Sequence, residues 1–148
     1  MEIVEAMTDT VVTASRDASL QDVAELMRDR SVGSVVIVDR DRPCALITDR
    51  DVAIAVGANG VKPSDGVDGH ASRPLVFGDV GMDVEEAAAK MVQHGVRRLP
   101  ILHDGALAGI VTLDDLAVKT GDLKLAQQMT AEVARAALPE FFFHQRGG

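Results

Sequence analysis

The sequence predicts an α+β fold in which one β-α-β-β-α unit occurs twice and is followed by a helical extension. The first observation is an internal repeat, because the 148-residue chain aligns with itself without a gap at an offset of 64 residues. The second is that helix-period and strand-period apolar patterns follow one another in the same order in both copies. The third is composition: 47% apolar and 26% charged residues are typical of a chain that folds by itself.

The repeat covers residues 13–51, which align with residues 77–115. Conservative exchanges surround the identities, so that the apolar pattern recurs as well as individual residues. The identical pairs are Ala24/Ala88, Met27/Met91, Val32/Val96, Ile37/Ile101, Thr48/Thr112 and Asp51/Asp115. One such unit is too small to bury its sheet alone, so we expect the two units to pack against each other.

Each copy is expected to open with a short strand and an amphipathic helix. The strands are predicted over residues 11–13 and 75–77, which are rich in apolar and β-branched residues. Apolar residues then recur at steps of three and four, at Leu20, Val23, Ala24 and Met27 and at Val84, Ala87, Ala88 and Met91. Ser19 and Asp83 precede these helices as N-caps, each with an acidic residue three positions later, in the pattern of a capping box.

Two compact strands and a second helix complete each copy. The strands are predicted from the runs SVVIVD and ALITD in the first copy and RRLPIL and AGIVTL in the second. Their continuous apolar character is typical of strands covered on both faces. Turns are expected at residues 40–43 and 103–106, and the second helix is expected to begin near Asp49 and Leu113.

The predicted domain division follows from this order. Residues 1–60 form the first unit, 61–73 a connection rich in Gly, Asp, Ser and Pro, 74–118 the second unit, and 119–148 a C-terminal helix with a Phe-rich tail. The helix presents one apolar face, with Gly121 as a break, and Phe141, Phe142 and Phe143 follow it. We interpret these Phe residues as packing onto this chain or an identical partner, with a surface for another protein as the alternative.

Charge and composition exclude several function classes. A net charge of −8, without Trp or Tyr, argues against binding to nucleic acid or an anionic membrane. A single cysteine, Cys44, allows no intrachain disulfide, and there is no signal-peptide pattern or long apolar run, so a cytoplasmic location is expected. The four His residues lack metal-ligand spacing, and no catalytic constellation is present, so we expect neither a metal site nor an enzyme.

The candidate site residues lie where the last strand of each copy ends. Thr48 and Asp51, and likewise Thr112 and Asp115, form a repeated T-x-x-D pattern. Capping of the next helix explains such a pattern, and a carboxylate at a strand end can also accept both hydroxyls of a ribose. Arg97 and Arg98 are either a solvated surface pair or a phosphate clamp. Arg50 is a further candidate, with a salt bridge to a nearby acid as the alternative.

Several sequence runs of both copies together resemble a known domain family. The runs MTDTVVT, LQDVAELM, SVVIVD and LITDRD, followed by VRRLPI and GIVTLDDL, resemble a tandem pair of CBS domains, the Bateman module, over residues 1 to 118. The resemblance implies two units related by a pseudo-twofold axis, packed through their sheets, with two clefts between them. It also implies binding of AMP, ADP, ATP or S-adenosylmethionine, no catalytic cofactor, and pairing into homodimers.

The resemblance also assigns roles to individual residues. Thr48 with Asp51, and Thr112 with Asp115, would hold a ribose, and Arg97 and Arg98 would meet phosphates. Apolar residues of both units would enclose the adenine: Val12, Thr13 and Ala18 at the second-copy site, and Val76, Phe77 and Met82 at the first-copy site. The first copy departs from this pattern, because Gly33 and Ser34 replace the basic pair and Met82 with Asp83 would crowd its cleft. The second-copy site is therefore expected to be the better one, and the other weak or empty.

The resulting functional prediction is a stand-alone regulatory module. An adenine nucleotide or S-adenosylmethionine would shift the angle between the units, as in sensing of cellular energy state, and an unidentified protein target would detect the shift. The alternative is a ligand-free module for dimerisation or protein interaction that acts through its dimer faces and the Phe-rich tail.

Overall fold

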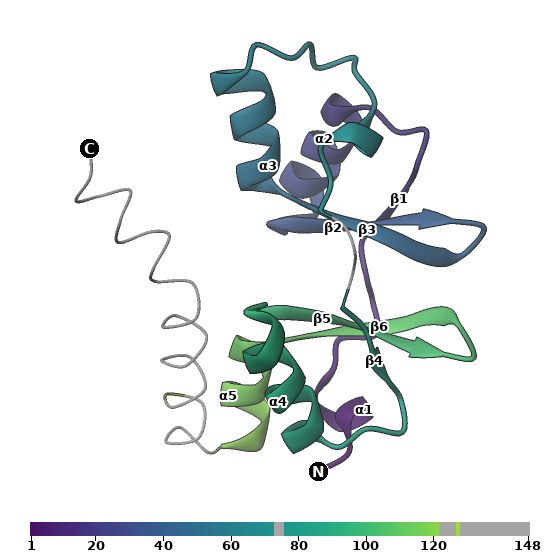
Figure 1. Ribbon diagram of the computed structural model, residues 1–148, viewed down its shortest axis with the longest axis vertical. Coiled ribbons are helices and arrows are strands. Elements are labelled where there is room, and N and C mark those ends of the chain that lie inside the picture. Colours follow the sequence, from purple (N-terminus) through teal and green to yellow (C-terminus); the bar gives the residue numbers. More distant parts are fainter. Residues whose placement is uncertain (73–75, 122–126, 128–148) are drawn as a thin grey trace. The chain divides into compact units, whose positions relative to one another are not determined.

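The computed structural model describes residues 1–72, 76–121 and 127, and the chain divides into two compact units (Figure 1). The copy-one unit consists mainly of residues 10–72. The copy-two unit consists mainly of residues 76–121 together with residues 1–9. Both are mixed α+β units built on a three-stranded sheet, as the sequence predicts.

The copy-one unit follows the predicted order of elements, with additional short helices at its end. Its sheet has the order β1-β2-β3, with β1 parallel and β3 antiparallel to β2. A π-helical turn continues α3, and a 3-10 turn follows it. The bounds are β1 Thr13–Ser15, α2 Leu20–Arg30, β2 Ser34–Asp39, β3 Arg42–Thr48, α3 Asp49–Ala53, η1 Ile54–Ala58 and η2 Val67–Gly69.

The copy-two unit repeats this plan and gains one short helix from the N-terminus. Its sheet has the order β4-β5-β6, with β4 parallel to β5. Its last helix, α5, ends at Thr120 and is followed by the C-cap Gly121, whose φ of 68° is left-handed and suits glycine. The bounds are α1 Ile3–Ala6, β4 Gly78–Asp79, α4 Val84–His94, β5 Arg98–His103, β6 Ala106–Thr112 and α5 Leu113–Thr120.

The first strand of each copy begins later than the sequence predicts. In copy one it starts at Thr13 rather than at residue 11, although the carbonyl of Val12 already accepts the N–H of Val36 at 3.0 Å. In copy two it starts at Gly78, after the expected residues 76 and 77, while Leu75 lies outside the described residues. Strand ends depend on which backbone groups find partners across the sheet, and apolar runs do not specify this.

Capping explains why the two long helices begin where they do. Ser19 and Asp22 form a reciprocal capping box, because the N–H of Asp22 donates to Ser19 Oγ at 3.0 Å and the N–H of Ser19 donates to Asp22 Oδ2 at 2.9 Å. Asp83 caps α4 by accepting the N–H of Glu86 at 2.8 Å. These bonds satisfy N–H groups that have no partner within the helix.

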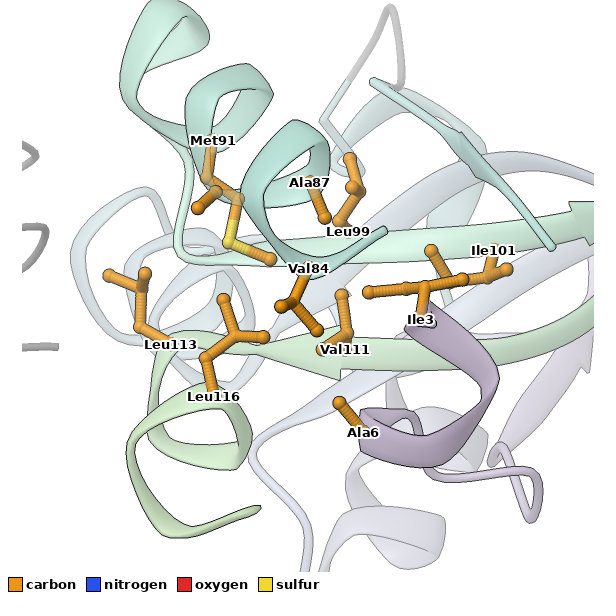
Figure 2. Close-up of a cluster of buried hydrophobic side chains, with 11 residues drawn as sticks. Ile3, Ala6, Val84, Ala87, Met91, Leu99, Ile101, Val111, Leu113 and Leu116 are labelled. Atoms are coloured by element: carbon orange, nitrogen blue, oxygen red, sulfur yellow. The ribbon is translucent and has the colours of Figure 1, made fainter. Parts of the chain in front are cut away.

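The copy-two core contains side chains from the N-terminal helix α1 (Figure 2). Ile3 and Ala6 are fully buried and point toward the side chains of α4, β5, β6 and α5. The other buried members are Val84, Ala87, Ala88, Met91, Leu99, Ile101, Val111, Leu113 and Leu116. The first residues of the chain are therefore a structural part of copy two.

The segment that precedes each copy packs on the other copy, which differs from the domain division expected from the sequence. Thr8 pairs with Ile110 through backbone hydrogen bonds of 2.8 and 2.9 Å, so residues 1–9 lie with copy two rather than with residues 10–60. Ser72 pairs with Leu46 in the same way, at 2.8 and 3.4 Å. Both pairs obey the 64-residue offset, so the exchange is symmetric.

The described part of the expected connection, residues 61–72, consequently belongs to copy one. Val67 is fully buried in its core, and the N–H of Val67 donates to the carbonyl of Ala18 at 3.0 Å. Arg16 adds an ion pair to Asp68 at 3.1 Å, and the hydrogen bond to Asp68 is the main reason why the pKa of the Arg16 guanidinium is raised. An apolar side chain at position 67 makes this segment pack rather than remain solvated.

The C-terminal extension expected from the sequence lies almost entirely outside the described residues. The helix expected beyond residue 121 and Phe141, Phe142 and Phe143 lie outside the described residues. Within the described part of the chain, no helix is both long and apolar enough to cross a membrane.

Candidate functional site

The repeated Thr and Asp form a reciprocal capping box at the end of the last strand in each copy. In copy two the N–H of Asp115 donates to Thr112 Oγ1 at 3.0 Å, and the N–H of Thr112 donates to Asp115 Oδ2 at 3.0 Å. In copy one the corresponding bonds of Thr48 and Asp51 measure 3.2 and 2.9 Å. The capping interpretation of the T-x-x-D pattern is therefore confirmed in both copies.

Capping uses only part of what these carboxylates can do. In each box Oδ2 of the Asp accepts the N–H of the Thr, and among the described residues the second carboxylate oxygen, Oδ1, has no hydrogen-bond partner. Asp51 and Asp115 are both half-buried. A carboxylate fixed through one oxygen can accept further hydroxyl donors through the other without losing its orientation.

The start of the second strand is tied to the start of the last helix. In copy two the N–H of Leu113 donates to the carbonyl of Arg97 at 3.2 Å, and in copy one the N–H of Asp49 donates to the carbonyl of Gly33 at 3.0 Å. This bond brings the residues that open β5 beside the first turn of α5. Residues 97 and 98 therefore lie next to Thr112, although 14 positions separate Arg98 from Thr112 in the sequence.

A small pocket of about 60 Å³, partly open to solvent, lies at this junction in the copy-two unit. Its lining consists of Arg97, Arg98, Thr112, Leu113 and Asp114. The pocket thus brings together three of the residues predicted for the second-copy site. Asp115 is not in the lining, but its capping box with Thr112 places it directly beside the pocket.

Two lining residues were not predicted from the sequence. Leu113 is buried and Asp114 is exposed, and both occupy the first turn of α5. Only their position could have marked them as pocket residues, because they are the two variable residues inside the T-x-x-D pattern. The pocket therefore carries a carboxylate as well as two guanidinium groups.

The corresponding place in copy one has a different charge distribution. Gly33 and Ser34 open the region of β2 where copy two has its arginines. Arg50 is exposed on the first turn of α3, at the position equivalent to Asp114, and it forms no ion pair with any described residue. The salt bridge considered for Arg50 from the sequence is therefore not observed among the described residues.

Four of the residues predicted to enclose an adenine ring, Val12, Ala18, Val76 and Met82, pack against the core of their own unit. Val12 and Ala18 pack against the copy-one core, while Thr13 is exposed in β1. Val76 packs against the copy-two core, and Phe77 is half-buried just before β4. Their contact with a ligand held by the other unit stays a prediction.

Both copies match the model of a known protein family, and a related protein matches most of the chain. The family model of the CBS domain matches residues 2–58 and 67–119. The CBS domain-containing protein YhcV of Bacillus subtilis is 37% identical over 134 residues, which make up 90% of this chain and 90% of YhcV.

Solved structures resemble the described fold closely. The CBS domain protein PAE2072 from Pyrobaculum aerophilum, complexed with AMP, aligns with a TM-score of 0.75 and 26% identity over 86% of this chain and 99% of its own. Hypoxic Response Protein I, solved with two coordinated zinc ions, aligns with a TM-score of 0.72 and 29% identity over 80% and 98% of the two chains. In the part of our chain that the structure describes, no group of three or more His, Cys, Asp or Glu side chains could hold a metal ion.

Proposed function

The chain belongs to the CBS-domain family, and from this membership we propose that it is a regulatory CBS pair that binds an adenine nucleotide at the second-copy site. In this proposal Thr112 and Asp115 hold the ribose, and Arg97 and Arg98 hold the phosphate. The solved relative PAE2072 supports the ligand class, because it is complexed with AMP. S-adenosylmethionine remains the other candidate ligand.

The observation that carries the proposal is the combination of charge and geometry at the junction of β5 and α5. Two guanidinium groups line one pocket with Thr112, and a carboxylate held by its capping box lies beside it. Guanidinium groups bind phosphate oxygens through paired charge-assisted hydrogen bonds. The carboxylate oxygen Oδ1 of Asp115, which has no partner among the described residues, could accept the hydroxyls of a ribose. The pocket and the carboxylate beside it therefore match the phosphate and the ribose of a nucleoside phosphate.

The proposed output is regulatory rather than catalytic. The pocket lining of two arginines, Thr112, Leu113 and Asp114 supports binding of a charged ligand as the role of this site. Binding would favour one arrangement of the chain over another, and a target protein would recognise that arrangement. Three further parts of the proposal come from the sequence alone: the module pairs into homodimers, it acts on a protein target, and it is located in the cytoplasm.

Substitution of Asp115 by Ala tests the ribose assignment, and Asp22→Ala is its matched control. Both residues close a reciprocal capping box, with bonds of 3.0 and 3.0 Å at α5 and of 2.9 and 3.0 Å at α2. Each variant should lose about 1 kcal/mol of stability through the lost cap. Only Asp115→Ala should also lose AMP binding, measured by isothermal titration calorimetry.

Equal AMP affinity in wild type and Asp115→Ala would refute the ribose assignment. If AMP, ADP, ATP and S-adenosylmethionine all leave the melting temperature of the wild-type protein unchanged, the ligand-free interaction module becomes the better description. At about one hundred times its Kd, a ligand stabilises by roughly 2.7 kcal/mol, so binding would be detected readily.

A further inference from the structure

The second-copy pocket contains an anion that the ribose and phosphate roles do not use. Asp114 lines the pocket with Arg97 and Arg98, and its side chain is exposed to the pocket and to solvent. Neither arginine forms an ion pair with it or with any other described residue. The carboxylate is therefore not neutralised by the cations that share its pocket.

Backbone hydrogen bonds on either side of residue 114 fix the position of its main chain beside the pocket. The bond from the N–H of Leu113 to the carbonyl of Arg97 fixes the residue just before Asp114 against the start of β5. The next residue, Asp115, turns back to cap Thr112. Two adjacent carboxylates thus have separate environments, one engaged in the capping box and one lining the pocket.

We propose that Asp114 is a specificity-determining residue that makes the second-copy site prefer a nucleoside monophosphate to a nucleoside triphosphate. This inference rests on the proposed function. Two guanidinium charges match the charge of one phosphate group, and every further phosphate adds negative charge near the carboxylate of Asp114. Like charges repel over several ångströms in a partly buried pocket, so the cost grows with the number of phosphates.

The other copy carries the opposite charge at the same position. Arg50 of copy one aligns with Asp114, while Gly33 and Ser34 align with the arginine pair. The fold therefore accepts either sign of charge at the second position of this helix. The carboxylate of copy two is not required for folding, and its substitution should leave the helix intact.

The test compares three ligands that share adenosine and differ in the number of phosphate groups they carry: adenosine, AMP and ATP, titrated by calorimetry in EDTA. All proteins carry Asp51→Asn, which removes the ribose carboxylate of the other copy, so that the second-copy site is measured. Asp114→Asn removes the charge and keeps the shape. Asp104→Asn is the control, because this Asp side chain is 93% exposed in the β5–β6 turn and does not line the pocket.

We expect Asp114→Asn to bind ATP about tenfold more tightly, AMP less than about threefold more tightly, and adenosine unchanged. Asp104→Asn should keep the wild-type ratio of AMP to ATP affinity. The inference is overturned if Asp114→Asn leaves that ratio unchanged, or if it alters all three affinities equally, as a purely structural role would. Failure of the proposed function looks different, because then none of the three ligands binds any of these proteins, and the inference fails with it.

Discussion

Replacing Gly109 by Ala tests whether residues 1–9 really close the copy-two unit. Gly109 is buried in β6, and a Cβ atom placed there would lie 2.6 Å from the Sδ of Met7 and 2.9 Å from the carbonyl oxygen of Thr8. The carbonyl is fixed, because it accepts the N–H of Ile110 at 2.9 Å. The methyl group can therefore be accommodated only if the N-terminal segment moves.

The first copy has side chains of different size at the two equivalent positions. Ala45 aligns with Gly109, and Ala71 aligns with Met7. Ala45 is fully buried, and Ala71 packs against the cluster that contains it. One copy thus combines a small strand residue with a large segment residue, whereas the other combines two small residues. This compensation suggests the rescue experiment.

Over-packing of this kind costs about 1–3 kcal/mol. Met7 is half-buried, so Met7→Ala should cost about 1 kcal/mol through lost apolar contact. The double variant imitates the Ala45–Ala71 pair, and we expect it to be more stable than the sum of the single losses by at least about 1 kcal/mol.

The assay is urea unfolding of wild type, both single variants and the double variant, with free energies compared at a common denaturant concentration. The corresponding change in melting temperature is about 2–4 °C for each kcal/mol in a chain of roughly this length. Additive losses in the double variant, or an unchanged stability of Gly109→Ala, would refute the described packing of residues 7 and 8 on β6.

Two further predictions follow from differences between the copies. Asp41 has a left-handed φ of 66° in the β2–β3 turn, at the position where copy two has Gly105. We therefore expect Asp41→Gly to raise the free energy of unfolding in urea by about 1 kcal/mol and Gly105→Asp to lower it. A loss of stability in Asp41→Gly would contradict this prediction. Replacing Arg97 by Gly and Arg98 by Ser, the residues of copy one, should weaken AMP binding by roughly 10-fold or more while adenosine binding persists; unchanged AMP affinity would exclude a phosphate contact.

The elements that local patterns specify could be predicted from the sequence. The helices α2 and α4 were expected from apolar residues at steps of three and four, and the structure confirms both, together with the caps Ser19 and Asp83. The last helix of each copy begins at Asp49 and Leu113 as expected. In these segments the information lies within a few residues, because capping and amphipathicity are local properties.

The exchange of the segments that precede the two copies could not be predicted from local patterns. It depends on contacts between Thr8 and Ile110, more than 100 positions apart, and residues 1–9 have no strong local pattern. A signal does exist in the repeat itself. If the 64-residue offset is extended toward the N-terminus, Ile3 aligns with Val67, and both side chains are fully buried. Equivalent burial of aligned apolar residues outside the obvious repeat would have indicated the exchange.

The candidate site was predictable to a similar degree. Thr112, Arg97 and Arg98 were selected by residue type and repetition, and the pocket brings them together. Asp114 was missed because its membership depends on the backbone bond between Leu113 and Arg97, which closes the pocket around the first turn of α5. Residue type alone marks Asp114 as one more surface acid.

The exchange gives the proposed binding site a physical connection to the rest of the chain. The helix α1 packs against α5, and Lys119 Nζ of α5 donates to the carbonyl of Met7 at 3.3 Å. Thr112 caps α5 and Asp115 lies in its first turn, so the proposed ligand would contact the same helix that packs against α1. Residues 10–12 then lead directly into β1 of copy one. Because a ligand shifts an equilibrium only through differential affinity, nucleotide binding at copy two can act on copy one to the extent that it favours one position of this segment.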